Sequence, residues 1–291
     1  MQTLMIDCSQ LCYKAFYTSL KGLSYDEKET GIIFGFLMQV FKLSKDFNTD
    51  KFLFCWDSKR NLRKMMYPEY KEKRKKELTE EEIEDNDLLY KQMDMLRKDI
   101  LPRMGFVNSF IRSGYEADDL IAYLAKRGKG HLIVSNDKDL YQLLDDCPIY
   151  LGVKERFTKN DFVDFYGIEP SQWVEAKAIG GCNSDCVKGV KGAADPAKST
   201  SSKAIAYIKG ELTKGVVFDR IKESKDIIER NKKLVTIPFD DGFDLEIKED
   251  EFKFLDWLDV FDEFDLRSFS TMKYLANLKK YFRFDGNDIL Y

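Results

Sequence analysis

The stretch GYEADDLIAYLAKRGKGHLIVSNDKDL, residues 114–140, places five carboxylates in two tight groups with none between them. The groups are Glu116, Asp118 and Asp119, and then Asp137 and Asp139. The segment EADDLIAYLAKRG repeats its apolar residues at helical spacing and ends in glycine, which predicts an amphipathic helix. The run HLIV that follows predicts a short buried strand. The stretch therefore predicts a helix that begins with acids and a strand that ends in acids.

Short apolar runs and helix-like segments alternate along the first half of the chain. TLMID (3–7) and KFLFCWD (51–57) predict strands that end in Asp7 and Asp57. The helix that begins GIIFGFLMQVFKL can be capped by Thr30, and DKDLYQLL predicts the start of another helix. Strands that alternate with helices predict an α/β fold with a parallel central sheet.

Acidic side chains are predicted to gather at one edge of this sheet. Asp7, Asp57 and Asp137 each follow a predicted strand, and the carboxyl ends of parallel strands form the edge where ligands bind. Each acid alone has an ordinary explanation, since Asp and Glu in a first helical turn accept from unpaired N–H groups. As a set they would repel one another and raise each other's pKa unless a cation neutralised them. Ligands that are all oxygen atoms indicate Mg²⁺ or Mn²⁺, and not zinc.

The net charge of −4 conceals blocks of opposite sign. Residues 58–76 hold nine basic residues and two acids, a local charge of +7, and TEEEIEDND (79–87) then adds six acids. Residues 186–235 hold twelve basic residues and six acids, a local charge of +6. Solvated helix faces would explain either basic block alone. Beside an acidic cation site, the blocks indicate metal-assisted attack on a phosphodiester.

The composition favours a soluble, charge-rich globular protein. The 291 residues are 44% apolar and 34% charged, enough for one large domain or two lobes. The start MQTLMIDCS has no basic n-region, and the longest apolar run, residues 31–41, is shorter than the ~20 residues that span a bilayer. Six dispersed cysteines do not indicate a disulfide framework. We therefore expect no membrane association and a cytoplasmic location, in the host cytoplasm if the chain is phage-encoded.

Several motifs of the chain are similar to those of one family. LMIDCSQLCYKAFY is similar to IDGNSLLYRAFF, TGIIFGFLMQVFKL to TGAVYGFLNMLLKL, and CWDSKRNLRKMMYPEYKEKR to FDxxxxxxR…PxYKxxR. GYEADD matches a family signature unchanged, SNDKDLYQLL is similar to GDKDLLQLV, and GGCNSDCVKGVKG to GDSSDNIPGVPG. These motifs identify a resemblance, over nearly the whole chain, to the 5′ nuclease or flap endonuclease family. That family includes the N-terminal domain of bacterial DNA polymerase I and the free-standing 5′→3′ exonucleases of tailed bacteriophages.

The resemblance implies a PIN-like nuclease core with a parallel central sheet and a helical arch. The core would occupy residues 1–165, with the basic arch at about 58–90. A C-terminal 5′-3′ exonuclease region, mostly helical, would occupy residues 166–291. It would contain the DNA-binding H3TH motif of the family at about 178–235.

The resemblance also implies two metal sites that work together. The first would comprise Asp7, Asp57, Glu116 and Asp118, with Asp119 as a ligand directly or through water. The second would comprise Asp137, Asp139 and Asp185. Two Mg²⁺ ions, with Mn²⁺ as a substitute, are the expected cofactors, and K⁺ at the H3TH motif is a further expectation.

Other residues are implied to act on the nucleic acid. Lys71 and Arg74 would donate to the scissile phosphate, while Tyr70 would stack on a base or, equally well, pack within the protein. The expected DNA-binding residues are Arg63, Lys188, Gly189, Lys191, Gly192 and Lys203. The glycines and lysines among them would hold the duplex through backbone N–H groups and phosphate contacts.

The chain departs from the family pattern near residue 182. Cys182 occupies the position of a metal-associated aspartate, and Cys186 that of an asparagine. The two thiols could form a soft metal pair, or Cys182 could be a tolerated substitution that weakens the second site by one negative charge. After Gly192 the insertion AADPAKSTSSKA leaves the alignment open between Lys198 and Lys203, and we favour Lys203 because KAIAYI predicts the next helix.

The remaining cysteines and the single histidine are expected to be structural. Cys8, Cys12 and Cys55 lie in apolar segments and should be small core residues. His131 falls on a predicted strand.

Three functions are consistent with these observations. The leading one is a structure-specific 5′ nuclease that acts on DNA with a 5′ flap or 5′ end, or on RNA–DNA primer junctions. The second is a nuclease-like DNA-binding protein whose chemistry is impaired by Cys182. The third is a PIN-like ribonuclease. For the leading function we expect a monomer that works beside replication proteins, since a partner must supply DNA synthesis.

Overall fold

The computed structural model describes the chain except residues 1, 19–23, 26–27, 73–78, 153–155 and 286–291. The chain forms two compact units, each built from separate segments. The first unit comprises Met1–Trp56, Leu78–Phe110 and Leu245–Tyr291, and the second comprises Asp57–Glu77 and Ile111–Asp244. The division at residue 165 stays a prediction, as does the arch at about 58–90, part of which lies outside the described residues.

Three parallel strands form the sheet of the first unit. They are β1 (Thr3–Asp7), β4 (Phe52–Cys55) and β5 (Ser109–Phe110), in the order β5-β4-β1. Asp7 lies opposite Cys55 in the register, so β1 and β4 end at the same edge. The strands predicted at 3–7 and 51–57 are therefore confirmed, and the thiols of Cys8, Cys12 and Cys55 are buried as predicted.

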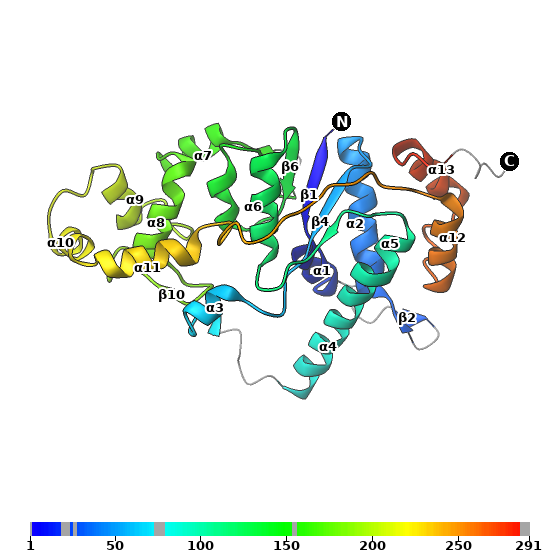
Figure 1. The fold of residues 1–291 in the computed structure, drawn as a ribbon, viewed down its shortest axis with the longest axis horizontal. Coiled ribbons are helices and arrows are strands. Elements are labelled where there is room, and N and C mark those ends of the chain that lie inside the picture. The colour runs from blue at the N-terminus through cyan, green and yellow to red at the C-terminus, as the bar shows by residue number, and fades with distance from the viewer. Residues whose placement is uncertain (1, 19–23, 26–27, 73–78, 153–155, 286–291) are drawn as a thin grey trace. The chain divides into compact units, whose positions relative to one another are not determined.

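The other elements of the first unit are mostly helices, and Figure 1 shows α2 (Gly31–Phe47) beside β4. The helices are α1 (Cys8–Phe16), α2, α4 (Glu80–Met95), a π-helical turn η2 (Leu96–Ile100), α5 (Leu101–Arg103), α12 (Phe254–Glu263) and α13 (Met272–Tyr281). The two-residue strands β2 (Ser24–Tyr25) and β3 (Lys28–Glu29) form a separate antiparallel pair. Phe41 of α2 packs against Trp257 of α12, at 5.3 Å between ring centroids, and against Phe269 at 5.1 Å. Aromatic contacts thus attach the end of the chain to α2.

The start of α2 differs from its prediction. Thr30 occupies the N-cap position, but its side chain makes no capping hydrogen bond. The buried side chain of Gln92, on α4, accepts from the backbone N–H groups of Ile32 and Ile33 at 3.1 Å each. A helix 60 residues away in the chain therefore supplies the cap that Thr30 was predicted to supply.

The strands of the second unit are β6 (His131–Val134), β7 (Ile149–Tyr150) and β8 (Arg156–Phe157), in the order β6-β7-β8. β6 and β7 are parallel, and β7 and β8 are antiparallel. The predicted strand at HLIV is confirmed, with His131 buried in it. An α/β fold with mostly parallel strands is thus confirmed.

Two helices of the second unit begin at the acidic segments. α6 (Ala117–Arg127) ends at Gly128, as predicted, and DKDLYQLL forms the 3-10 helix η3 (Lys138–Leu143), not an α-helix. Trp173 supports η3, because its indole N–H donates to the carbonyl of Lys138 at 2.7 Å. Its ring also packs against Tyr141 of η3, at 5.8 Å between centroids.

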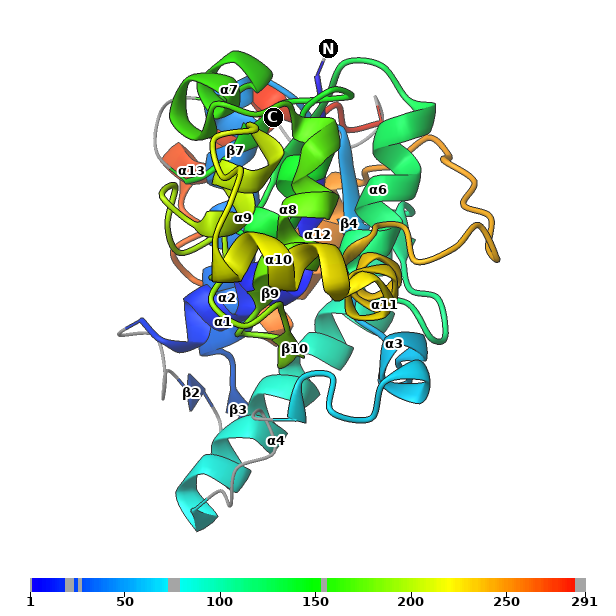
Figure 2. The same ribbon diagram turned by 90° about the vertical axis from the view of Figure 1, so that its left-hand side faces the viewer.

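The rest of the second unit is mostly helical (Figure 2). Its helices are α3 (Leu62–Met66), α7 (Lys159–Tyr166), the 3-10 turn η4 (Pro170–Gln172), α8 (Trp173–Gly180), α9 (Lys203–Ile208), α10 (Val216–Glu223) and α11 (Lys225–Val235). The antiparallel pair β9 (Gly181–Cys182) and β10 (Val187–Lys188) follows α8. Asn231 of α11 donates to the carbonyls of Ala178 and Lys188, at 2.9 Å each, and so joins α11 to α8 and β10.

The helix predicted after the insertion begins at Lys203. Ser202 is its N-cap, and the Ser202 hydroxyl accepts from the Ile205 N–H at 3.2 Å. The predicted helix KAIAYI is therefore confirmed, while the alignment of Lys203, and not Lys198, with the family's lysine stays a prediction. No helix in the described part of the chain is long and apolar enough to cross a membrane.

Candidate metal centre and active site

Seven of the eight predicted metal ligands belong to the second unit. Asp7 is the exception: it closes β1 in the first unit, and its carboxylate accepts from the Gln10 N–H at 3.1 Å at the start of α1. Of the other acids, Asp57 lies in the loop that follows β4, and the rest lie at the start of a helix or on a turn in the second unit.

Three side chains of the second predicted metal site gather in the structure. The ligand atoms of Asp139, Cys182 and Asp185 all lie within 4.8 Å of one another. Cys182 therefore lies beside two of the predicted ligands of the second site. The two carboxylates fit a hard divalent cation, whereas the thiol offers such an ion little. Among the described residues this group does not include Cys186, so it does not support the Cys182–Cys186 pair.

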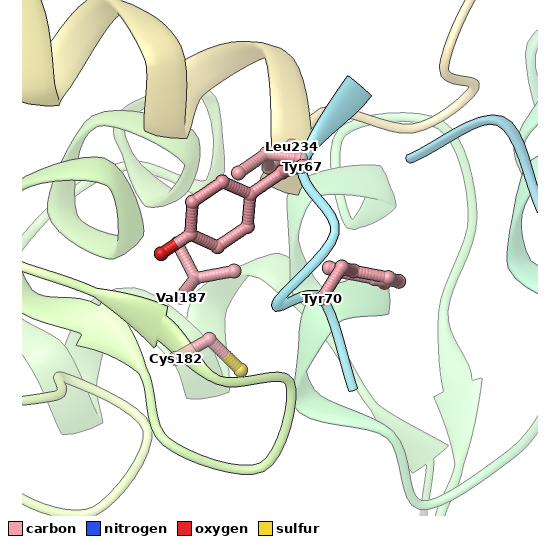
Figure 3. Close-up of a cluster of buried hydrophobic side chains, with 5 residues drawn as sticks. All are labelled: Tyr67, Tyr70, Cys182, Val187 and Leu234. Carbon is pink, nitrogen blue, oxygen red and sulfur yellow. The ribbon is translucent and has the colours of Figure 1, made fainter. Parts of the chain in front are cut away.

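The thiol of Cys182 also belongs to a hydrophobic cluster. Figure 3 shows it with Tyr67, Tyr70, Val187 and Leu234, all of them buried. Its Sγ lies 3.0 Å from the hydroxyl of Ser184. Burial raises the pKa of the thiol, so it is neutral at physiological pH.

Asp137 begins η3 beside this group. Its carboxylate accepts from the backbone N–H of Asp139 at 2.8 Å. The loss of water around the carboxyl group and the charge of Asp139 raise the pKa of Asp137 to about 6, although part of the residue is exposed. Without a bound cation, ionisation of Asp137 beside the charged Asp139 is thus unfavourable.

Lys177 is a member of the site that the sequence did not single out. It lies on α8 with a side chain 3% exposed, and its ammonium is 2.6 Å from the Asp139 carboxylate. Burial alone would lower the pKa of this lysine, but the charge of Asp139 outweighs it and the pKa is raised. The available signal was a lysine inside the otherwise apolar segment AKAIGG.

Glu116 is held by three side chains at the start of α6. Its carboxylate accepts from the Tyr70 hydroxyl at 2.9 Å and from Arg63 at 3.3 Å, and it forms an ion pair with Lys71. Burial alone would raise the pKa of Glu116, but the charges of Lys71 and Arg63 outweigh it and lower the pKa. Glu116 is therefore ionised and fixed in position.

Arg63 and Asp119 form a buried bidentate pair, with both N–O distances at 2.7 Å. Arg63 is 2% exposed, and its remaining hydrogen bonds go to Glu116 and to the carbonyls of Leu234 and Thr236. Asp119 is 0% exposed and also accepts from the N–H groups of Phe239 and Glu116. The five N–H donors of a guanidinium are thus all used inside the protein. This geometry favours a structural role for both residues over the predicted DNA contact of Arg63 and metal ligation by Asp119.

Tyr70 and Lys71 lie against Asp185 as well as Glu116. Tyr70 is buried in the cluster of Figure 3, with its hydroxyl 3.3 Å from the Asp185 carboxylate, so it packs within the protein. The backbone N–H of Lys71 donates to the Asp185 carbonyl at 2.8 Å, and its ammonium is 3.9 Å from the Asp185 carboxylate. Arg74 lies outside the described residues.

Asp57 and Asp118 are the remaining predicted ligands. The carboxylate of Asp57 is exposed and accepts from the Ala117 N–H at 2.9 Å, at the start of α6. Asp118 is half-buried in the first turn of the same helix. Both thus lie where α6 begins: Asp118 is two residues after Glu116 in the chain, and Asp57 bonds to Ala117, the residue after Glu116.

The predicted DNA-binding lysines on β10, after it and on α9 are accessible. The side chains of Lys188, Lys191 and Lys203 are exposed. Gly189 packs on α8 so closely that a Cβ would lie 2.3 Å from the Gly180 backbone, and Gly192 has a φ of +92°. The close backbone approach at Gly189 and the positive φ at Gly192 each require glycine if strain is to be avoided.

Comparison with known proteins places the chain among nucleases. The family described as 5′-3′ exonuclease, N-terminal resolvase-like domain, matches residues 2–167. A 5′-3′ exonuclease of Aquifex aeolicus is 30% identical over 264 residues, 87% of each chain. A 5′-3′ exonuclease of Buchnera aphidicola subsp. Schizaphis graminum is 32% identical over 195 residues, 64% of each chain. DNA polymerase I of Mycobacterium tuberculosis is 28% identical over 80% of this chain and 27% of the polymerase.

The chain thus spans less than two thirds of the Buchnera protein and about a quarter of the polymerase.

Solved structures share its fold. The 5′-exonuclease of bacteriophage T5 with bound zinc ions has a TM-score of 0.65 at 21% identity, covering 82% of this chain and 90% of the other. A bacteriophage T5 flap endonuclease in complex with DNA and metal ions also has a TM-score of 0.65, at 19% identity, covering 81% and 89%. By its sequence match, this chain belongs to the 5′→3′ exonuclease family.

Proposed function

We propose that this protein is a structure-specific, divalent-metal-dependent 5′ nuclease that hydrolyses phosphodiesters near a 5′ single-strand/duplex junction. The observation that carries the proposal is the gathering of Asp139, Cys182 and Asp185 in one group. Lys71 joins that group to Glu116, since it contacts both Glu116 and Asp185. Carboxylates held beside a lysine suit a reaction in which negative charge builds on a phosphate.

The acids divide into two sets of ligands in this proposal. Asp139 and Asp185, with Asp137 beside them, would hold one ion, and Asp7, Asp57, Glu116 and Asp118 would hold the other. We propose Mg²⁺ as the natural ion with Mn²⁺ as a substitute, and K⁺ at the H3TH motif. When bound, such ions lower the pKa of an attacking water and neutralise charge on the phosphate. Asp119 would act by holding Arg63 and the N–H of Glu116, and not as a ligand.

The protein's own side chains would orient the substrate. The Lys71 ammonium forms an ion pair with Glu116 in this structure. It would donate to the scissile phosphate in the reaction, and Arg74 is expected to donate to the same phosphate. Tyr70 would fix the carboxylates of Glu116 and Asp185 through its hydroxyl. The exposed lysines around β10 would hold the duplex through its phosphates, without reading its sequence.

The test is cleavage of a labelled 5′-flap duplex with Mg²⁺, with Mn²⁺ and with EDTA, beside a single-stranded RNA and an RNA–DNA primer junction. We expect cutting near the junction with either metal and none with EDTA. Tight duplex binding without cleavage would instead support the impaired DNA-binding protein. Cleavage of single-stranded RNA alone would support the PIN-like ribonuclease.

A further inference from the structure

The side-chain amide of Gln142, on η3, joins the main chain of Asp139 to the end of α11. Its NH₂ group donates to the backbone carbonyls of Asp139 at 2.8 Å and of Val235 at 3.1 Å. Its carbonyl oxygen accepts from the Ile237 N–H at 3.0 Å. Two carbonyls require the NH₂ group and an N–H requires the oxygen, so these partners fix the orientation of the amide. Gln142 thus holds a proposed metal ligand against the chain that leaves α11.

Arg63 bonds to the neighbouring carbonyls of the same stretch of chain. Its guanidinium donates to the carbonyls of Leu234 and Thr236, at 2.8 Å each. The carbonyl of Val235, between them in the chain, bonds to Gln142. Leu234 and Val235 are the last residues of α11, where backbone carbonyls have no partner within the helix. Side chains from two other elements thus cap this helix end.

The same stretch of chain also reaches the start of α6. The backbone N–H of Phe239 donates to the Asp119 carboxylate at 2.8 Å, and its ring lies 5.2 Å from the Arg63 guanidinium. Arg63 in turn donates to Glu116 at 3.3 Å. Residues 234–239, which we call the linking segment, therefore connect η3 to the start of α6. All of these residues belong to the second unit.

We propose that Gln142 is a positioning residue for the reaction, which holds η3 at a fixed separation from the start of α6 through the linking segment. The inference rests on the proposed nuclease function, in which η3 and α6 supply ligands to different ions. Two ions act on one phosphate only if their ligands are correctly spaced. An uncharged amide suits this place, because it holds the main chain of Asp139 without competing with the cation for its carboxylate.

The first test is Gln142→Met, which keeps roughly the volume and removes all three hydrogen bonds. At saturating Mg²⁺ the single-turnover rate of flap cleavage should fall about 10- to 100-fold, as for residues that orient metal ligands, while duplex affinity stays unchanged. Mn²⁺ binding to the DNA-free protein, measured by EPR of the free ion, should weaken about tenfold.

Gln39→Met is the matched control. Gln39 is a half-buried glutamine of α2, and its amide also donates to two backbone carbonyls, those of Leu11 and Gly35, at 3.1 Å each. Its replacement should lower the melting temperature but change neither the cleavage rate nor the binding of Mn²⁺. Equal effects of the two variants on rate and ion binding would overturn the proposal, as would a Gln142→Met variant that loses only duplex affinity.

Gln142→Glu takes the place of Gln142→Met if the latter does not fold. It keeps the size of the side chain and the acceptor for Ile237, and it loses both donated bonds. It should slow cleavage in the same way, and cleavage at the wild-type rate would overturn the proposal. A wild type that neither binds Mn²⁺ nor cuts would instead overturn the proposed function.

The second test asks whether Gln142 and Arg63 act through the same segment. Arg63→Lys keeps the charge but cannot make the bidentate pair with Asp119 and both carbonyl bonds together. Because contacts in one network are not additive, the double variant should cut at least about fivefold faster than the product of the two single losses predicts. Losses that simply multiply would overturn the role of the linking segment.

Discussion

Arg63 and Asp119 are paired across 56 residues of chain, and their pairing decides what each can do. The motif around Arg63 predicted a DNA-binding residue, and the GYEADD signature predicted a ligand at Asp119, directly or through water. Both side chains are instead buried, with their hydrogen-bonding groups turned toward each other and toward the backbone. A linear motif shows which residues are needed but not which partner each will meet. For the same reason Lys177 was missed, since its role depends on Asp139, on another element.

Asp118 gives the sharpest test of the carboxylates as ligands. It is half-buried in the first turn of α6, where Asn keeps the size of the side chain and removes the charge. Asp118→Asn should reduce single-turnover flap cleavage at least about 100-fold while leaving duplex binding and the melting temperature nearly unchanged. Cleavage near the wild-type rate with Mg²⁺ would show that Asp118 is not a ligand. Asp164→Asn serves as the control, because Asp164 is an exposed acid of α7 in the same unit.

Asp250 predicts a pH dependence that is separate from the active site. Its carboxylate accepts from the Val107 N–H and from the Asn108 side chain at 3.0 Å each, and burial raises its pKa from 3.8 to about 6. Because the folded pKa is raised, the folded state loses stability as pH rises from about 4 to about 6, and the loss is complete above that range. Asp250→Asn should therefore raise the unfolding free energy by about 1–2 kcal/mol at pH 8 and by much less at pH 4. Chemical denaturation at both pH values measures this, and an equal effect at both would contradict it.

The elements of the fold were predictable where the signal is local. Strands at 3–7, 51–57 and 131–134, the end of α6 at Gly128 and the start of α9 at Lys203 all follow from nearby residues. The cap of α2 was not predictable in this way. Thr30 has the right residue type and place, yet the N–H groups of Ile32 and Ile33 bond to Gln92 on α4. The acceptor of both donors comes from a helix far away in the chain, which local residues do not reveal.

Removal of this cap should be costly. Gln92→Met keeps roughly the volume but leaves two buried N–H groups without their acceptor, so the unfolding free energy should fall by about 2–4 kcal/mol. Thr30→Val should cost much less, because the Thr30 side chain makes no capping bond. Urea unfolding of the two variants compares them directly. A larger loss for Thr30→Val would show that the local residue is the true cap.

At the scale of the whole molecule, charge is distributed unevenly between the two units. The block at 186–235, with a local charge of +6, lies wholly in the second unit. Lys188, Lys191 and Lys203 expose their side chains there. Binding to a duplex through such residues releases counterions and depends steeply on salt.

Lys191→Ala should weaken duplex binding about equally for unrelated sequences and lower the slope of log affinity against log salt by about 1. Lys273→Ala is the control, since Lys273 is an exposed lysine of α13 in the first unit. Fluorescence anisotropy across a salt series gives both slopes. If the two variants behave alike, the contact surface of the duplex has been wrongly placed.

Trp173 gives the second unit an optical signal of its own. Of the three tryptophans, Trp56 and Trp257 belong to the first unit and Trp173 alone to the second. Its indole N–H is bonded to the carbonyl of Lys138, between Asp137 and Asp139, so a cation that pulls on those carboxylates also disturbs the ring's surroundings. In a Trp56→Phe, Trp257→Phe background, emission from Trp173 would therefore follow occupancy of the site in a protein that has no substrate to cut.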